Sequence, residues 1–153
     1  MESPFCDGKA YLIKKSTVIP YRKENFEITR SLYRCEQTGL EFSTEEQDKE
    51  AVFQVYEQYR KKHGIPSPKD IKALREKYGI SSTKMSLILG FGVNQYYNYE
   101  NGEVPSLSNS KLILAAMNPD FFLTLVKIVK EDLGEKIYNR ILNLKISHHA
   151  ESL

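Results

Sequence analysis

The sequence lacks the features that mark several large classes of protein. It has only two cysteines, three histidines and a formal net charge of +2 in 153 residues. No apolar run is long enough to span a bilayer, and the first residues do not resemble a signal peptide. We therefore expect a cytoplasmic protein with no membrane-spanning segment. So small a net charge does not by itself indicate nucleic-acid binding.

Catalytic motifs are also missing from the sequence. There is no glycine-rich phosphate-binding loop after a strand, no HExxH motif, and no cysteine or serine beside a suggestive histidine. We therefore predict a protein that is not an enzyme and needs no cofactor. Its hydrophobic content of 41% is enough to build one core or two small ones.

Three short helices are predicted between residues 67 and 102, with a glycine closing each of the first two. Ser67 and Ser81 are suitable N-cap residues, because a serine side chain accepts a hydrogen bond from the first turn. The turn Gly90-Phe91-Gly92 alone separates the second helix from the third, which begins near Val93. Two helices joined by so short a turn form a helix-turn-helix.

The third helix has asparagines on its outer face. Asn94, Asn98 and Asn101 recur at i, i+4 and i+7, although asparagine is a poor residue for a helix interior. An asparagine or glutamine amide can pair with the exposed edge of adenine in the major groove of DNA. The alternative is a polar face with no partner. The predicted base-reading residues are Asn94, Gln95 and Asn98.

Other residues near this helix are expected to contact the DNA backbone or to flank the base contacts. They are Ser82, Thr83, Lys84, Tyr97 and Asn101. A basic block borders the same segment and is suited to neutralising phosphates, although each of its members could equally belong to a solvated helix face. The block consists of Arg60, Lys61, Lys62, Lys69, Lys72, Arg75, Lys77 and Lys84.

Two sets of residues in this region resemble known families. The run from Leu74 to Gly102, with Leu89-Gly90 before the turn and Tyr99-Glu100-Asn101-Gly102 after it, resembles the Xre/Cro-type helix-turn-helix. Within that group, Phe91-Gly92-Val93-Asn94 followed by Tyr96 resembles the MqsA/YgiT antitoxin subgroup. This resemblance implies that Asn94 reads a base. The subgroup's arginine is replaced here by Asn98, and its usual glutamine by Ser82.

The N-terminal part has a different pattern. Phe26, Ile28 and Leu32 recur on one face at a period of two, which predicts a small antiparallel sheet with a turn near residues 21–24. Ser43 to Glu46 has the capping-box pattern, and a helix is predicted from about Thr44 to His63. Residues 64–67 then form the expected linker, because Pro66 opposes helix continuation.

The antitoxin resemblance also implies a zinc-binding module built from two Cys-x-x-Cys pairs. In this chain one cysteine of each pair is replaced, so that the four positions hold Ser3, Cys6, Cys35 and Thr38. Neutral hydroxyls are poor substitutes for zinc-binding thiolates. We therefore expect a degenerate module that folds without metal, in which the two cysteines are buried thiols rather than a disulfide.

The C-terminal part is predicted to form three further helices. The first, which starts at Ser106, should close the helix-turn-helix core. The two after it have wide apolar stripes, which suit either a dimer interface or the protein's own core. The predicted dimerisation residues are Phe121, Phe122, Leu125, Val129, Ile137 and Ile141. Residues 147–153 are expected to be a disordered tail.

Together these patterns predict an α+β protein with three parts. Residues 1–64 form a β module with one helix that binds a partner, residues 65–146 form an all-α, Xre/Cro-like DNA-binding and dimerisation domain, and residues 147–153 form the tail. By resemblance the chain is a homodimeric antitoxin that binds double-stranded DNA and a cognate toxin and represses its own operon. The alternatives are a stand-alone transcriptional regulator and an RNA-binding or adaptor protein.

Overall fold

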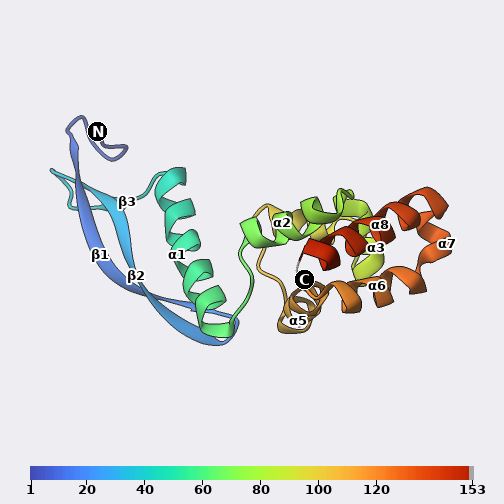
Figure 1. Ribbon diagram of the computed structural model, residues 1–153. Coiled ribbons are helices and arrows are strands. Elements are labelled where there is room, and N and C mark those ends of the chain that lie inside the picture. Colours follow the sequence, from blue (N-terminus) through green and yellow to red (C-terminus); the bar gives the residue numbers. More distant parts are fainter. Residues whose placement is uncertain (152–153) are drawn as a thin grey trace. The chain divides into compact units, whose positions relative to one another are not determined.

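The computed structural model describes the backbone of residues 1–151 and the side chains of residues 1–144. The chain divides into two compact units, an N-terminal unit of residues 1–62 and a C-terminal unit of residues 63–153 (Figure 1). The strands are β1 (Ala10–Tyr21), β2 (Glu24–Cys35) and β3 (Glu41–Phe42). The helices are α1 (Glu45–His63), α2 (Pro68–Tyr78), α3 (Ser82–Leu89), α4 (Gln95–Glu100), α5 (Leu107–Ala116), α6 (Pro119–Ile128), α7 (Lys130–Leu133) and α8 (Glu135–Glu151).

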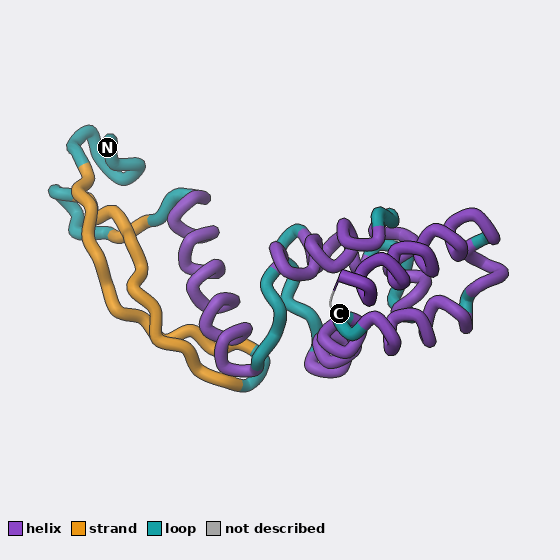
Figure 2. Tube along the Cα trace, viewed as in Figure 1, coloured by secondary structure: helices purple, strands orange, loops and turns teal. Residues whose placement is uncertain are grey.

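This order of elements confirms the predicted α+β class, with a three-stranded antiparallel sheet followed by a helical region (Figure 2). The division between the units falls two residues before the expected boundary at residue 64. None of the helices in the described part of the chain is both long and apolar enough to cross a membrane.

The N-terminal unit is built on a long hairpin. β1 and β2 pair antiparallel over their whole length, and the two residues between them, Arg22 and Lys23, both have positive φ angles of 49° and 66°. Positive φ at both positions belongs to the tight turn that matches strand twist, where glycine or asparagine is usual. The Arg22 guanidinium lies 5.2 Å from the ring centre of Tyr21 and 5.1 Å from that of Tyr59. These cation–π contacts offset part of the backbone strain.

One face of the hairpin is covered by α1. Phe26 and Ile28 of β2 are 5% and 3% exposed, as the period of two predicted. On the helix, Val55 and Tyr59 are also buried, and the rings of Phe26 and Tyr59 lie 6.0 Å apart. The apolar core of this unit is therefore small and rich in aromatic rings.

Glutamine side chains of α1 cover the outer edge of β2. Within the described part of the chain, that edge pairs with another strand only through the two residues of β3. Along the rest of it, the Gln54 amide accepts from the backbone N–H of Thr29 at 3.1 Å and donates to its carbonyl at 2.9 Å, and Gln58 donates to the carbonyl of Glu27 at 2.8 Å. The helix thus satisfies backbone groups that would otherwise form an open strand edge.

The capping box of α1 lies one residue later than predicted. Thr44 accepts from the Gln47 backbone N–H at 3.2 Å, and the Gln47 side chain accepts from the Thr44 backbone N–H at 3.0 Å. Ser43 instead donates its hydroxyl hydrogen to Asp48 at 2.6 Å. Overlapping patterns of the same kind cannot be separated by spacing alone, which explains the error of one position.

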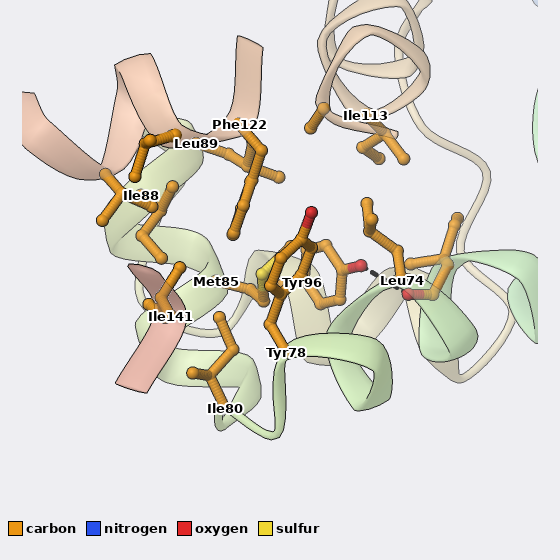
Figure 3. Packing of buried hydrophobic residues seen from close by; sticks show 14 of the residues in the cluster. Leu74, Tyr78, Ile80, Met85, Ile88, Leu89, Tyr96, Ile113, Phe122 and Ile141 are labelled. Carbon is orange, nitrogen blue, oxygen red and sulfur yellow. Dashed lines mark hydrogen bonds between the residues drawn. The ribbon is translucent and has the colours of Figure 1, made fainter. Parts of the chain in front are cut away.

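The C-terminal unit packs its helices around one core (Figure 3). The Tyr78 and Phe122 rings stack with their centres 4.3 Å apart, and Figure 3 shows Phe122 pointing toward Tyr78. Four helices begin with the side-chain caps that serine and asparagine favour: Ser67, Ser81, Ser106 and Asn118 each accept from a backbone N–H of the first turn. α2 and α3 end at Gly79 and Gly90 in the left-handed conformation, as predicted.

The structure at the end of the chain differs from our prediction. The backbone of residues 147–151 continues α8, whereas we predicted a disordered tail over residues 147–153. Residues 152 and 153 lie outside the described residues.

Candidate nucleic-acid interface

The helix-turn-helix geometry is formed by α3 and α4. At the end of α3, Gly90 has a φ of +75°, and the Phe91 N–H donates to the Ser86 carbonyl at 2.8 Å. The chain turns through Phe91 and Gly92, and α4 begins at Gln95, two residues later than expected. Because α4 has only six residues, its position depends on contacts with the rest of the unit.

Buried hydrogen bonds fix α4 against α2 and α3. The backbone N–H of Tyr96 donates to the Ser86 hydroxyl at 3.1 Å, and the Tyr96 hydroxyl donates to the carbonyl of Ile71. Tyr96 is fully buried, which raises the pKa of its hydroxyl and keeps it protonated as a donor. At the other end of α4, Asn109 donates to the Tyr99 hydroxyl at 2.8 Å. Tyr96 and Tyr99 are both buried, so the two tyrosines of α4 face the interior of the unit.

An ion pair that the sequence did not reveal joins α2 to α4. Arg75 donates from Nε and Nη2 to the two carboxylate oxygens of Glu100, the second at 3.2 Å, and from Nη1 to the Ile80 carbonyl at 3.3 Å. The Glu100 side chain is only 8% exposed, and the hydrogen bond to it raises the pKa of Arg75. Such a two-point pair sets orientation as well as distance. It requires a contact across 25 residues, which helical periodicity cannot predict.

The outer face of α4 presents amides that are not used within the protein. Asn94 precedes the helix and makes no side-chain cap, and Asn98 lies on the exposed face. Neither side-chain amide is hydrogen-bonded within the described part of the chain. Val93 and Tyr97 are 64% and 56% exposed beside them. This surface combines amide donors and acceptors with apolar contact area.

The other two predicted amides of this region are engaged. Gln95 is half-buried and donates to the carboxylate of Glu103. Asn101 follows α4 and donates to the Tyr97 carbonyl at 2.8 Å, so it caps the helix end. Of the three asparagines predicted to share one outer face, Asn94 and Asn98 therefore have available side chains, whereas the Asn101 amide is directed to the backbone.

The beginning of α3 lies next to this surface. Thr83 and Lys84 line a cavity of about 250 Å³ together with Val93, which directly precedes Asn94. Thr83 is exposed, whereas Ser82 and Lys84 are half-buried. The structure thus brings Thr83 and Lys84, two of the predicted flanking residues, close to Val93 just before α4.

The basic block is smaller than its sequence indicates. Arg60 is 5% exposed and pairs with Glu57 at 2.9 Å, Lys62 pairs with Glu24, and Arg75 is held by Glu100. These three cations are occupied in intramolecular contacts. In the C-terminal unit, the exposed lysines of α2 are Lys69, Lys72 and Lys77.

Residues 71–120 match the family model for the helix-turn-helix, in its Xre type. The matched segment runs from within α2 to the second residue of α6 and so includes α3, the turn and α4. No curated protein matches the chain. The helix-turn-helix match confirms the Xre/Cro part of the resemblance and supports a DNA-binding transcription regulator.

The predicted dimerisation residues lie mostly within the protein's own core. Phe122 and Ile141 are fully buried among the helices of the same chain. Three others, Leu125, Val129 and Ile137, are half-buried and pack on that core. Among the six predicted dimerisation residues, only Phe121 is exposed, at 38%. Adjacent phenylalanines on a helix point about 100° apart, and the sequence does not indicate which one turns inward.

A second polar cluster lies in the N-terminal unit, at the four degenerate zinc positions. The sulfurs of Cys6 and Cys35 are 3.0 Å apart, and hydrogen bonds from Ser3 and then Thr38 lower the pKa of Cys35 to about 6. The fold thus brings all four side chains together. Two thiols and two neutral hydroxyls do not fit a structural zinc ion, which takes four imidazole, thiolate or carboxylate ligands.

Proposed function

We propose that this protein is a sequence-specific transcriptional repressor that reads DNA bases with Asn94 and Asn98. The observation that carries this proposal is the pair of exposed, unengaged amides on a helix that buried contacts hold in place. An amide paired with adenine in the major groove contributes about 1–3 kcal/mol of discrimination between bases. Gln95 is a weaker candidate for base reading, because its amide already binds Glu103.

The surface around these amides fits the same function. Val93 and Tyr97 offer apolar contact that suits the methyl group of thymine. Thr83 and Lys84 line the cavity beside Val93, and phosphate contacts from them and from Ser82 would fix the register of the helix on DNA. The exposed lysines of α2 add positive charge that would favour association with DNA.

The chain is further proposed to be the antitoxin of a type II toxin–antitoxin pair that represses its own operon in the cytoplasm. The support is the antitoxin-like run Phe91-Gly92-Val93-Asn94 and the separate N-terminal unit, which has no part in the helix-turn-helix. That unit exposes Leu12, Val18 and Phe53, each more than half exposed, as apolar contacts for a toxin. A homodimer would present two copies of α4 to successive turns of DNA.

Fluorescence anisotropy with DNA from upstream of the protein's own gene tests the DNA part. The wild type should bind this duplex more tightly than a scrambled duplex, with affinity that falls steeply as salt rises. Asn94→Ala and Asn98→Ala should each weaken specific binding by about 10-fold, in line with a lost amide–base pair. Alanine is a good helix former, so a loss at Asn98 would not reflect a weaker helix.

The matched control is Asn143→Ala, which removes an exposed amide from α8. It should bind as the wild type does. Equal affinity of the wild type for both duplexes, or equal losses in all three variants, would contradict base reading by α4.

The antitoxin part has its own test. The product of the adjacent gene should arrest growth when expressed alone, and co-expression with this chain should restore growth and yield a complex of the two proteins. Val18→Asp should weaken that complex without changing DNA affinity. Absence of both rescue and a complex would leave a stand-alone regulator, the alternative function. Sedimentation of the free chain as a monomer at micromolar concentration would contradict the homodimer.

A further inference from the structure

The two cysteines of this protein, which the proposed DNA-binding function does not use, lie together at one end of the hairpin. Cys35 is the last residue of β2, and Cys6 lies in the turn that precedes β1, yet their sulfurs are only 3.0 Å apart. A disulfide bond is about 2.05 Å long, so a shift of about 1 Å would join the two atoms. They are 29 residues apart in sequence, which makes the contact a product of the fold.

Backbone groups hold both sulfurs in place. The Gly8 N–H donates to the Cys6 sulfur at 3.3 Å, and the Thr38 N–H donates to the Cys35 sulfur at 3.5 Å. A Cβ atom at Gly8 would lie 2.9 Å from the Gln37 side chain and 3.3 Å from the Cys6 sulfur. The turn is therefore closely packed around Cys6, and a side chain at Gly8 would displace the flexible end of Gln37.

The two thiols differ in access to solvent. Cys35 is 1% exposed, whereas Cys6 is half-buried and can be reached by a small molecule. An accessible thiol beside a buried second thiol is the arrangement in which oxidation of the first is followed by attack of the second. Because the donor set does not suit zinc, the closeness and unequal access of the two thiols favour oxidation over metal binding.

We propose that Cys6 and Cys35 form a modification site at which hydrogen peroxide produces a reversible intramolecular disulfide. The Cys6 thiolate attacks one peroxide oxygen, breaks the O–O bond and releases hydroxide, which leaves a sulfenic acid on Cys6. The Cys35 thiolate then attacks the Cys6 sulfur and displaces a second hydroxide. The two thiol protons convert both hydroxides to water, so two thiols and one peroxide give one disulfide and two water molecules.

The surroundings of Cys35 suit it to the second step. Hydrogen bonds to its sulfur favour the thiolate, which is the attacking form of a cysteine. The product would tie the first residues of the chain covalently to the end of β2. Within the N-terminal unit this closes a loop of about 30 residues, and closure of such a loop stabilises the folded state.

Thiol mapping on the full-length reduced chain tests the proposal. The protein is exposed to hydrogen peroxide, denatured in N-ethylmaleimide and analysed by intact mass. Both thiols should become unreactive together, with a mass loss of two hydrogen atoms and no intermolecular product. Dithiothreitol should restore both thiols. This measurement needs no substitution, so it does not depend on the folding of a variant.

A variant supplies the second measurement. In Cys35→Ser the sulfenic acid on Cys6 has no partner thiol, so dimedone should trap it in much higher yield than in the wild type. Three results would overturn the proposal. They are equal dimedone trapping in both proteins, addition of oxygen atoms to Cys6 while Cys35 still reacts with N-ethylmaleimide, and protection of both thiols by stoichiometric zinc that a chelator removes.

Discussion

The two units of this protein are stabilised in different ways. The C-terminal unit encloses a continuous cluster of large side chains from α2 to α8, and buried hydrogen bonds fix α4 on that cluster. The N-terminal unit has a smaller apolar interior, and side chains of α1 bind the backbone edge of a long hairpin. Burial of apolar side chains is therefore the main source of stability in the C-terminal unit, where a short helix must be held rigidly. In the N-terminal unit, which presents an extended surface, polar contacts spread along the hairpin contribute more.

Loss of Phe122 should be the most damaging change. Phe122→Ala would leave a cavity against Tyr78 in the C-terminal core and should lower the free energy of unfolding by about 3–5 kcal/mol. Urea denaturation followed by circular dichroism would measure it. Ile128→Ala in the same helix is the control, since that side chain is 75% exposed and should cost less than about 1 kcal/mol. Similar losses in the two variants would contradict a core centred on Phe122.

Removal of one charge from the ion pair between α2 and α4 should have the next largest effect. Glu100→Gln leaves the Arg75 guanidinium with a neutral partner in a partly buried site, which should cost about 2 kcal/mol. DNA affinity should also fall, because Glu100 helps to orient α4. The matched control is Glu76→Gln, whose exposed ion pair with Lys72 spans 3.8 Å and should contribute little. An unchanged unfolding midpoint in Glu100→Gln would show that the pair does not anchor α4.

In the N-terminal unit, loss of a single polar contact should lower the free energy of unfolding by less than the two changes above. Gln54→Ala removes both hydrogen bonds to the Thr29 backbone and should cost about 1 kcal/mol. Hydrogen exchange should show faster exchange of the Thr29 amide. Glu50→Ala, at an exposed position of the same helix, is the control and should leave that amide protected. If Gln54→Ala were as destabilising as Phe122→Ala, the contrast between the two units would be wrong.

The smallest expected effect is a gain in stability. Lys23→Gly would relieve the positive φ of 66° in the hairpin turn and should stabilise the N-terminal unit by about 0.5–1 kcal/mol. Thermal unfolding monitored on this unit would measure the change. Lys14→Gly, at an exposed strand position, should destabilise instead, because glycine is unfavourable within a strand. A loss in both variants would indicate that the turn is not strained.

Features that depend on neighbouring residues were predicted well from the sequence. Ser67 and Ser81 cap helices, and Gly90 ends α3, because capping is decided within a few residues of the chain. The alternation of Phe26 and Ile28 likewise indicated which face of β2 is buried. For the candidate interface, these short-range signals were enough to predict α3, the turn and α4.

Features that depend on distant contacts were missed or misplaced. The Arg75–Glu100 pair and the engagement of Gln95 by Glu103 both arise only when α4 is packed in place. Arg75 was therefore counted as a possible phosphate contact, although it acts within the fold. The proximity of Cys6 and Cys35 likewise requires the strand register, and the sequence alone indicated it only through a family resemblance.

The shortness of α4 has a thermodynamic consequence for ligand association. Six residues do not form a stable helix in water, so the ordering entropy of this segment is offset during folding by Ser86, Ile71 and Glu100. A segment ordered in advance loses little further freedom when it meets its ligand. Calorimetry of the association should therefore show a heat-capacity change that matches the buried contact area alone, without the larger change that accompanies coupled folding.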